Sequence, residues 1–137
     1  GPWGRPDMAY YQFSKKLLNN EEINLFNNGQ LSRDMTYIED IVNGVMSSIE
    51  YVQKTQNNHE IFNLGSSMPI KTVDLLKIIE DEFKKNGHIK HIKTTKEVKI
   101  TCANITKANS ILGYQPKTEI EDGMRSFFDW FKVYYEI

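Results

Sequence analysis

Hydrophobic residues recur every three to four positions in five stretches of the chain, which is the spacing of an amphipathic helix. Asp7, Thr72 and Thr118 stand where three of these stretches begin, as helix-capping residues do. The predicted helices run from Asp7 to about Leu18, from Asp40 to Val52, from Thr72 to Phe83, from Asn104 to Leu112 and from Thr118 to Phe131.

Four shorter runs have the apolar or alternating pattern of β-strands. They are Ile23–Phe26, Met35–Ile38, Glu60–Leu64 and Ile89–Thr95. The third run, the helix from Thr72 and the fourth run follow one another in the order of a parallel crossover unit. Together with the helices, these runs predict a mixed α/β fold.

The composition narrows the choice of partners. The 137 residues suit one domain, and 17 basic against 18 acidic residues create no broad field for nucleic acid or an anionic membrane. No apolar run approaches the roughly 20 residues of a membrane span. Cys102 is the only cysteine, so an internal disulfide is excluded. We expect a cytoplasmic protein in which Cys102 is a small buried residue.

Two familiar catalytic patterns are weak in this sequence. Tyr11 and Lys15 lie four residues apart and share a helix face, where an ammonium could help a phenol to transfer a proton. No Gly-rich dinucleotide-binding turn accompanies them, so we favour a surface helix. His59, His88 and His91 have no cysteine or carboxylate cluster at metal-ligand spacing. No metal site is therefore predicted.

Residues 27–40, NNGQLSRDMTYIED, contain the best candidate for an anion site. Arg33 stands at the end of a turn, where the chain enters a short strand, and its planar guanidinium suits a phosphate or a carboxylate. A surface ion pair of Arg33 with Asp34 or Glu39 explains the spacing equally well.

Four motifs, in order and spacing, resemble the C-terminal part of extended short-chain dehydrogenase/reductases that act on nucleotide sugars. They are GPWGRPDM at residues 1–8, SRDMTYIED at 32–40, FNLG at 62–65 and GYQPKT at 113–118. The first motif is most similar to UDP-glucuronate 4-epimerases. The resemblance covers essentially the whole chain.

The resemblance implies that residues 1–137 form a UDP-sugar-binding domain, a small mixed sheet with helices, from which the Rossmann-type NAD-binding half is absent. Residues 36–65 would complete the sheet of that missing half. The intact parent would use NAD to oxidise C4 of the sugar and reduce it again. The catalytic tyrosine and lysine would lie upstream, so we expect this chain alone to bind no NAD and to be inactive.

The resemblance also assigns roles to seven residues. Arg33 would pair with the diphosphate, and the backbone of Met8 and Ala9 would lie near it. Phe26 and Asn24 would contact the uracil. The remaining two assignments are Glu97, at the ribose hydroxyls, and Arg5, at the sugar carboxylate.

Two departures from the family pattern concern this site. Lys96-Glu97 stands where Gly-Asp is common, which changes the reach of the ribose contact. Ala103-Asn104 replaces an Ala-Asp pair, and Asn104 can still cap a helix.

Other functions remain open on this sequence. The parent could be a nucleotide-sugar dehydratase or decarboxylase, or the chain could be a non-catalytic nucleotide-sugar-binding module. Alone, it would expose an apolar edge and face, from which we expect a homo-oligomer or swapped dimer.

Overall fold

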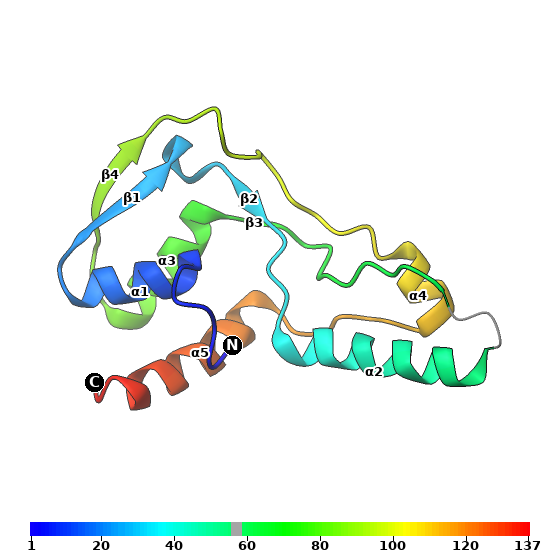
Figure 1. Ribbon diagram of the computed structural model, residues 1–137. Helices are drawn as coiled ribbons and strands as arrows, with labels where there is room; N and C mark the ends of the chain where they lie inside the picture. Colours follow the sequence, from blue (N-terminus) through cyan, green and yellow to red (C-terminus); the bar gives the residue numbers. More distant parts are fainter. Residues whose placement is uncertain (56–58) are drawn as a thin grey trace. The chain divides into compact units, whose positions relative to one another are not determined.

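In the computed structural model, which describes residues 1–55 and 59–137, the chain divides into two units that are considered separately. The sheet unit comprises Pro2–Arg33 and Pro69–Thr101. The helical unit comprises Gly1, Asp34–Met68 and Cys102–Ile137. Each unit is therefore assembled from segments that are distant in the sequence (Figure 1).

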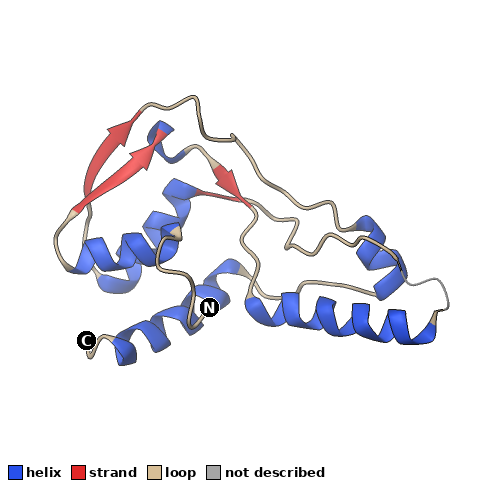
Figure 2. Ribbon diagram, viewed as in Figure 1, coloured by secondary structure: helices blue, strands red, loops and turns tan. Residues whose placement is uncertain are grey.

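The sheet unit contains all four strands and two helices of the described residues (Figure 2). In chain order its elements are α1 (Ala9–Leu18), β1 (Glu22–Phe26), a 3-10 turn (Asn27–Gly29), β2 (Ser32–Arg33), β3 (Ile70–Lys71), α3 (Thr72–Phe83) and β4 (His88–Ile92). β1 and β4 are parallel, in register from Glu22 opposite His88 to Phe26 opposite Ile92. β2 and β3 form a separate antiparallel pair.

The core of the sheet unit follows from the alternation of β1. Ile23 and Leu25 are buried, while the residues on either side of them are more exposed. α1 packs against α3, and each helix has apolar residues on one face. Leu17, Leu75 and Ile79 are buried on those faces, so the period-2 and period-3.6 patterns of the sequence account for this core.

The helical unit contains α2 (Ile38–Lys54), α4 (Thr106–Leu112) and α5 (Ile120–Tyr134). α2 packs closely through Gly44, where an added Cβ would lie 2.7 Å from Leu64 and 2.9 Å from Tyr114. The Tyr114 hydroxyl donates a hydrogen bond to the Gly65 carbonyl at 3.1 Å. Four residues of α5 are buried, namely Met124, Phe127, Phe128 and Phe131.

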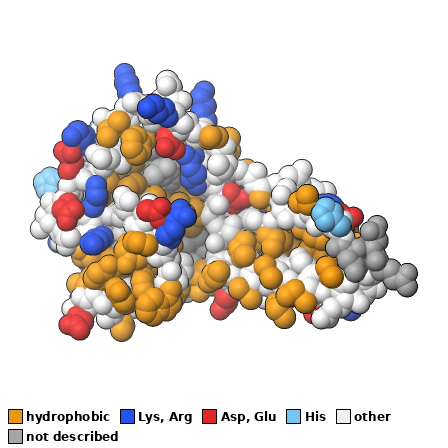
Figure 3. All heavy atoms as spheres, viewed as in Figure 1, with side chains coloured by type: hydrophobic (Ala, Val, Ile, Leu, Met, Phe, Trp, Pro, Cys, Tyr) orange, Lys and Arg blue, Asp and Glu red, His pale blue; other side chains and the backbone are white. Residues whose placement is uncertain are grey.

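The opposite face of α2 is apolar and exposed. Six of its residues recur at helical spacing, and their exposed fractions lie between 45% and 53%. They are Ile38, Val42, Val45, Met46, Ile49 and Val52. Figure 3 shows hydrophobic side chains gathered along this helix. We call these six residues the α2 stripe.

All five predicted helices are confirmed, whereas the side-chain caps predicted at Asp7, Thr72 and Thr118 are wrong. No residue at the N-cap position of these helices makes a side-chain capping bond. Thr72 instead donates its hydroxyl to the Leu31 carbonyl at 2.8 Å. Asn104 does bond near a helix start, because its Oδ1 accepts the Thr106 N–H at 3.1 Å. No helix among the described residues combines the length and the apolar character that a membrane span needs.

Two predicted strands are absent from the described residues. Residues 35–37 form neither strand nor helix, and Ile38 begins α2. Residues 60–64 are also irregular, so the parallel crossover predicted between them and β4 is wrong, and β1 is the parallel partner of β4. A strand is defined by its backbone partner, which an apolar run cannot specify on its own.

Asp34 organises the segments that surround this irregular region. Its carboxylate accepts hydrogen bonds from the backbone N–H groups of Ser66 at 3.0 Å, Ser67 at 3.2 Å and Ala103 at 2.8 Å. The Ser66 hydroxyl also donates to it. Partial burial raises the pKa of Asp34, but these four hydrogen bonds outweigh it and hold the pKa below its usual value.

We predict that Asp34→Asn destabilises the chain by about 2 kcal/mol, because charge-assisted hydrogen bonds are lost. Folding lowers the pKa of Asp34, so its contribution is complete above the pKa of the unfolded chain and is lost as the pH falls through the folded value. Urea unfolding at neutral and acidic pH measures both effects, and the variant's deficit should shrink in acid. The control is Asp122→Asn, in an exposed pair with Arg125 on α5. Equal stability of the two variants would contradict the role of Asp34.

Candidate functional site

The candidate site forms where the parallel strands β1 and β4 end. In parallel sheets, ligands bind beyond the carboxyl ends of the strands. Here the segments that leave Phe26 and Ile92 line a cavity of about 640 Å³. Its lining residues are Asn27, Asn28, Lys93, Thr94, Thr95 and Lys96.

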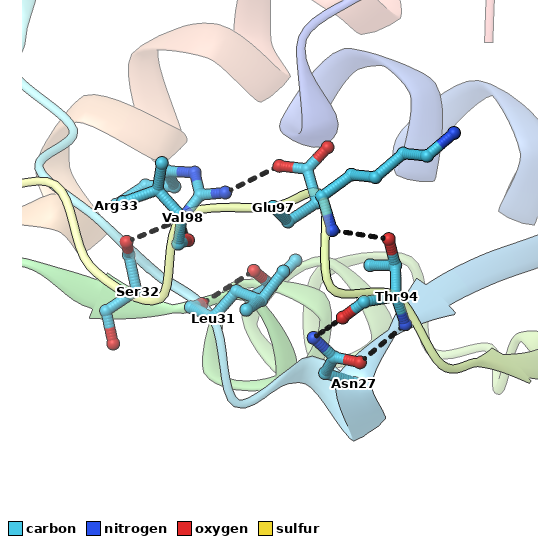
Figure 4. Close-up of polar contacts among 9 residues, drawn as sticks. Asn27, Leu31, Ser32, Arg33, Thr94, Glu97 and Val98 are labelled. Carbon is cyan, nitrogen blue, oxygen red and sulfur yellow. Dashed lines mark hydrogen bonds and ion pairs between the residues drawn. The ribbon is translucent and has the colours of Figure 1, made fainter.

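Asn27 ties the two sides of this cavity together. Its Nδ2 donates to the Thr94 carbonyl, and its Oδ1 accepts the Thr94 N–H, both at 2.9 Å (Figure 4). The side-chain amide thus takes the place of a backbone partner just beyond the paired strands. The sequence pattern gave no indication that the Asn27 side chain would bind a residue 67 positions away.

The turn after β1 requires an unusual backbone. Asn27, Asn28 and Gly29 have positive φ values of 47°, 57° and 71°. Asparagine and glycine are the residues that accept this left-handed region most readily. At Gly29 an added Cβ would also lie 2.6 Å from that of Val73, so glycine is required twice over.

Arg33 is held in β2 by neighbours on both sides. β3 pairs with this strand, placing Arg33 opposite Ile70. On the other side, the Ser32 N–H donates to the Lys99 carbonyl at 2.9 Å, and the Thr101 N–H donates to the Ser32 carbonyl at 3.1 Å. The backbone that carries the guanidinium is therefore held by main-chain hydrogen bonds rather than by side-chain packing alone.

The guanidinium of Arg33 points toward the segment that follows the cavity (Figure 4). Its Nη1 donates to the carbonyls of Ser32 at 2.9 Å and Val98 at 2.8 Å. Its Nη2 donates to Oε2 of Glu97 at 2.9 Å. The side chains are 28% exposed at Arg33 and 47% exposed at Glu97, so solvent reaches this ion pair.

The surface pairs expected of Arg33 with Asp34 or Glu39 are thus replaced by a pair with Glu97, 64 residues away. All seven residues predicted for the site belong to the sheet unit. Arg33 and Glu97 are brought into contact. Phe26, 40% exposed, and half-buried Asn24 lie on β1.

The other three predicted site residues lie at the start of α1. Exposed Arg5 pairs with Asp7 at 2.5 Å, and its Nη2 lies 3.6 Å from the sulfur of Met8. Met8 is the N-cap residue of α1, and Ala9 is the first residue of the helix. Backbone N–H groups in a first helical turn can bind an anion, which is the role predicted for these two residues.

The weaker catalytic and metal candidates have mixed outcomes. Tyr11 is only 6% exposed, so the surface-helix interpretation is wrong for this residue, although Lys15 is exposed. His88 and His91 are exposed on β4, as predicted. Cys102 is exposed, so its prediction as a buried residue is wrong. Within residues 1–55 and 59–137, no group of three or more His, Cys, Asp or Glu side chains could hold a metal ion.

The fold defines the class of protein. The mixed α/β arrangement matches the C-terminal part of epimerases and dehydratases of the extended short-chain dehydrogenase/reductase class. The sequence model of the GDP-mannose 4,6 dehydratase family matches residues 10–127, and the chain belongs to this family. The resemblance inferred from the four motifs is confirmed.

Individual relatives are similar over almost the whole chain. UDP-glucuronate 4-epimerase 4 of Arabidopsis thaliana is 37% identical over 149 aligned residues, which cover 98% of this chain and 34% of that protein. An uncharacterized protein of Methanocaldococcus jannaschii is 40% identical, over 96% of this chain and 39% of its own length. The chain therefore spans little more than a third of these relatives.

A solved structure agrees with this comparison. The UDP-glucuronic acid 4-epimerase of Bacillus cereus, in complex with UDP-glucuronic acid and NAD, has a TM-score of 0.86 and 30% sequence identity. The similarity covers 98% of this chain and 43% of that one.

We predict that Asn27→Ala destabilises the sheet unit by about 1–2 kcal/mol, because both hydrogen bonds to the Thr94 backbone are lost. Thermal unfolding followed by circular dichroism measures the loss. Asn28→Ala is the control, since Asn28 lines the same cavity. Its change should be smaller, and equal losses in the two variants would show that the bonds to Thr94 contribute nothing specific.

Proposed function

We propose that the sheet unit binds the nucleoside diphosphate of a UDP-sugar, as the substrate-binding part of an NAD-dependent UDP-glucuronate 4-epimerase. The observation that carries this proposal is the guanidinium of Arg33, which is held by two backbone carbonyls and by Glu97, the residue that follows the lining of the cavity at the ends of β1 and β4. The similarity to UDP-glucuronate 4-epimerases supports the choice of ligand.

Arg33 suits a diphosphate for a geometric reason. Two backbone carbonyls fix Nη1, so the plane of the guanidinium is set before a ligand arrives. A planar fork of N–H donors matches two phosphate oxygens, and an already oriented side chain loses little entropy on binding. Two basic residues, Lys93 and Lys96, line the cavity and add positive charge to it.

The other predicted site residues would contact further parts of the UDP-sugar. The exposed ring of Phe26, with Asn24 two residues before it on β1, would hold the planar uracil. The N–H of Ala9, the first residue of α1, would bind the diphosphate, with the backbone of Met8 beside it, whose own N–H donates to the Arg5 carbonyl at 3.1 Å. One further contact is assigned to Arg5, at the sugar carboxylate. The carboxylate of Glu97, which the family resemblance puts at the ribose, is instead paired with Arg33.

NAD would supply hydride removal and return at C4 of the sugar, but the residues of this chain do not fit NAD. The glycine-rich turn that lets a backbone approach the pyrophosphate is missing from the sequence. The glycine that follows β1 lies against Val73 instead of facing an open phosphate site. In this proposal the chain contributes substrate binding, which keeps the UDP end anchored while the sugar turns.

We propose further that the α2 stripe makes the isolated chain a homo-oligomer in which the stripe of one copy packs on that of a second. Six half-exposed apolar side chains along one helix face form a patch that soluble monomers rarely leave in water. Their helical spacing suits packing against another helix.

The proposed diphosphate site can be tested at Arg33. Arg33→Ala should weaken UDP binding by at least about tenfold, because a charge-assisted contact with the diphosphate is lost. Isothermal titration of the chain with UDP measures this, beside the control Arg125→Ala, which removes an exposed arginine of α5. Unchanged affinity in Arg33→Ala, or no UDP binding at all, would refute the proposed diphosphate site.

The proposed self-association can be tested in the α2 stripe. Ile49→Lys, near the middle of the stripe, should shift the chain toward the monomer, because burying an ammonium in an apolar contact is unfavourable. Sedimentation velocity across a wide concentration range measures the association. Asn43→Lys is the control, since it places the same charge on an exposed position of α2 outside the stripe. A wild-type chain that is monomeric throughout would rule out self-association.

A further inference from the structure

The ion pair between Arg33 and Glu97 places a carboxylate where the proposed function needs a phosphate. Nη2 of Arg33 donates to Oε2 of Glu97 at 2.9 Å. A carboxylate and a phosphate compete for the same planar donors, since both are anions that accept hydrogen bonds from guanidinium. We infer that Glu97 is a built-in competitor of the diphosphate at Arg33 and thereby lowers the affinity of the site. This inference rests on the proposed function.

Glu97 is not needed to orient the guanidinium. Nη1 is held by the carbonyls of Ser32 and Val98, which belong to the backbone. Both carbonyls would remain if the carboxylate left. The acidic side chain therefore contributes charge to the site, while the backbone contributes position.

The carboxylate can leave Arg33 without disturbing the fold around it. Glu97 lies in an irregular stretch between β4 and the backbone contacts of Lys99, and 47% of its side chain is exposed. The backbone N–H of Lys96, just before it, donates to the Thr94 hydroxyl at 3.1 Å. The chain at Glu97 is thus held by its neighbours, whereas the side chain can turn into water.

The side chain of Glu97 reaches the guanidinium of Arg33 directly. Glutamate has one methylene more than aspartate, and here that length places Oε2 on the guanidinium. An exposed ion pair of this kind changes a binding constant by about two- to fivefold. This role differs from the ribose contact that the family resemblance implies for Glu97. A competing carboxylate changes ligand affinity only when the ligand carries a diphosphate and Arg33 is present.

The test measures the affinity of the 137-residue chain for UDP and for uridine by isothermal titration. Glu97→Gln keeps the size of the side chain and removes its charge. It should tighten UDP binding about two- to fivefold and leave uridine binding unchanged, since uridine has no diphosphate. In the Arg33→Ala background the same substitution should leave UDP affinity unchanged, which completes a double-mutant cycle. Glu97→Ala should act in the same direction.

Glu22→Gln is the matched control, because Glu22 forms a comparable ion pair in the same unit, with Lys90 at 3.0 Å. Equal tightening by Glu22→Gln would indicate a general charge effect and overturn the inference. Weaker binding of both UDP and uridine by Glu97→Gln would assign Glu97 to the ribose and overturn it as well. UDP affinity that does not depend on Arg33 would instead refute the proposed function.

Discussion

The helical unit is held by the carboxylate of Asp34 at the point where its irregular segments meet. It contains no β-strand among its described residues, so its extended segments cannot be held by a sheet. Asp34 replaces that support by accepting the backbone N–H groups of Ser66, Ser67 and Ala103. Thr36 assists, since its Oγ1 also accepts the Ser66 N–H at 2.9 Å. Three segments that are distant in the sequence converge on this group, and its charge makes each hydrogen bond stronger than a neutral one.

In the sheet unit, neutral groups hold the backbone segments that lie beyond the ends of the strands. Its candidate site lies on segments that leave the sheet, where the regular ladder no longer pairs the backbone. The amide of Asn27 pairs with the Thr94 backbone, and the Ser32 backbone bridges to residues 99 and 101. An anion-binding arginine needs such rigidity, because each freedom that remains in the unbound site is an entropy cost at binding.

Local pattern predicts much of this fold. Helices are defined by contacts between residues three or four positions apart, so all five were predicted from the sequence. Strands depend on partners, and residues 60–64 have the composition of a strand without its structure. The same limit applies to the site, where the sequence singled out Arg33 but the partner, Glu97, lies 64 residues away. The family resemblance selected both residues and gave no sign that they would meet.

Capping shows how a long-range contact can override a local preference. Thr72 stands at a helix start with a side chain suited to the exposed N–H groups of the first turn. Its hydroxyl bonds instead to the Leu31 carbonyl, which also accepts the Thr72 backbone N–H at 2.9 Å. That carbonyl lies next to β2, so the start of α3 fixes the strand that carries Arg33. Thr72 therefore stabilises the position of β2 and Arg33 instead of capping its own helix. The sequence alone predicts the cap, and the tertiary structure shows the long-range contact.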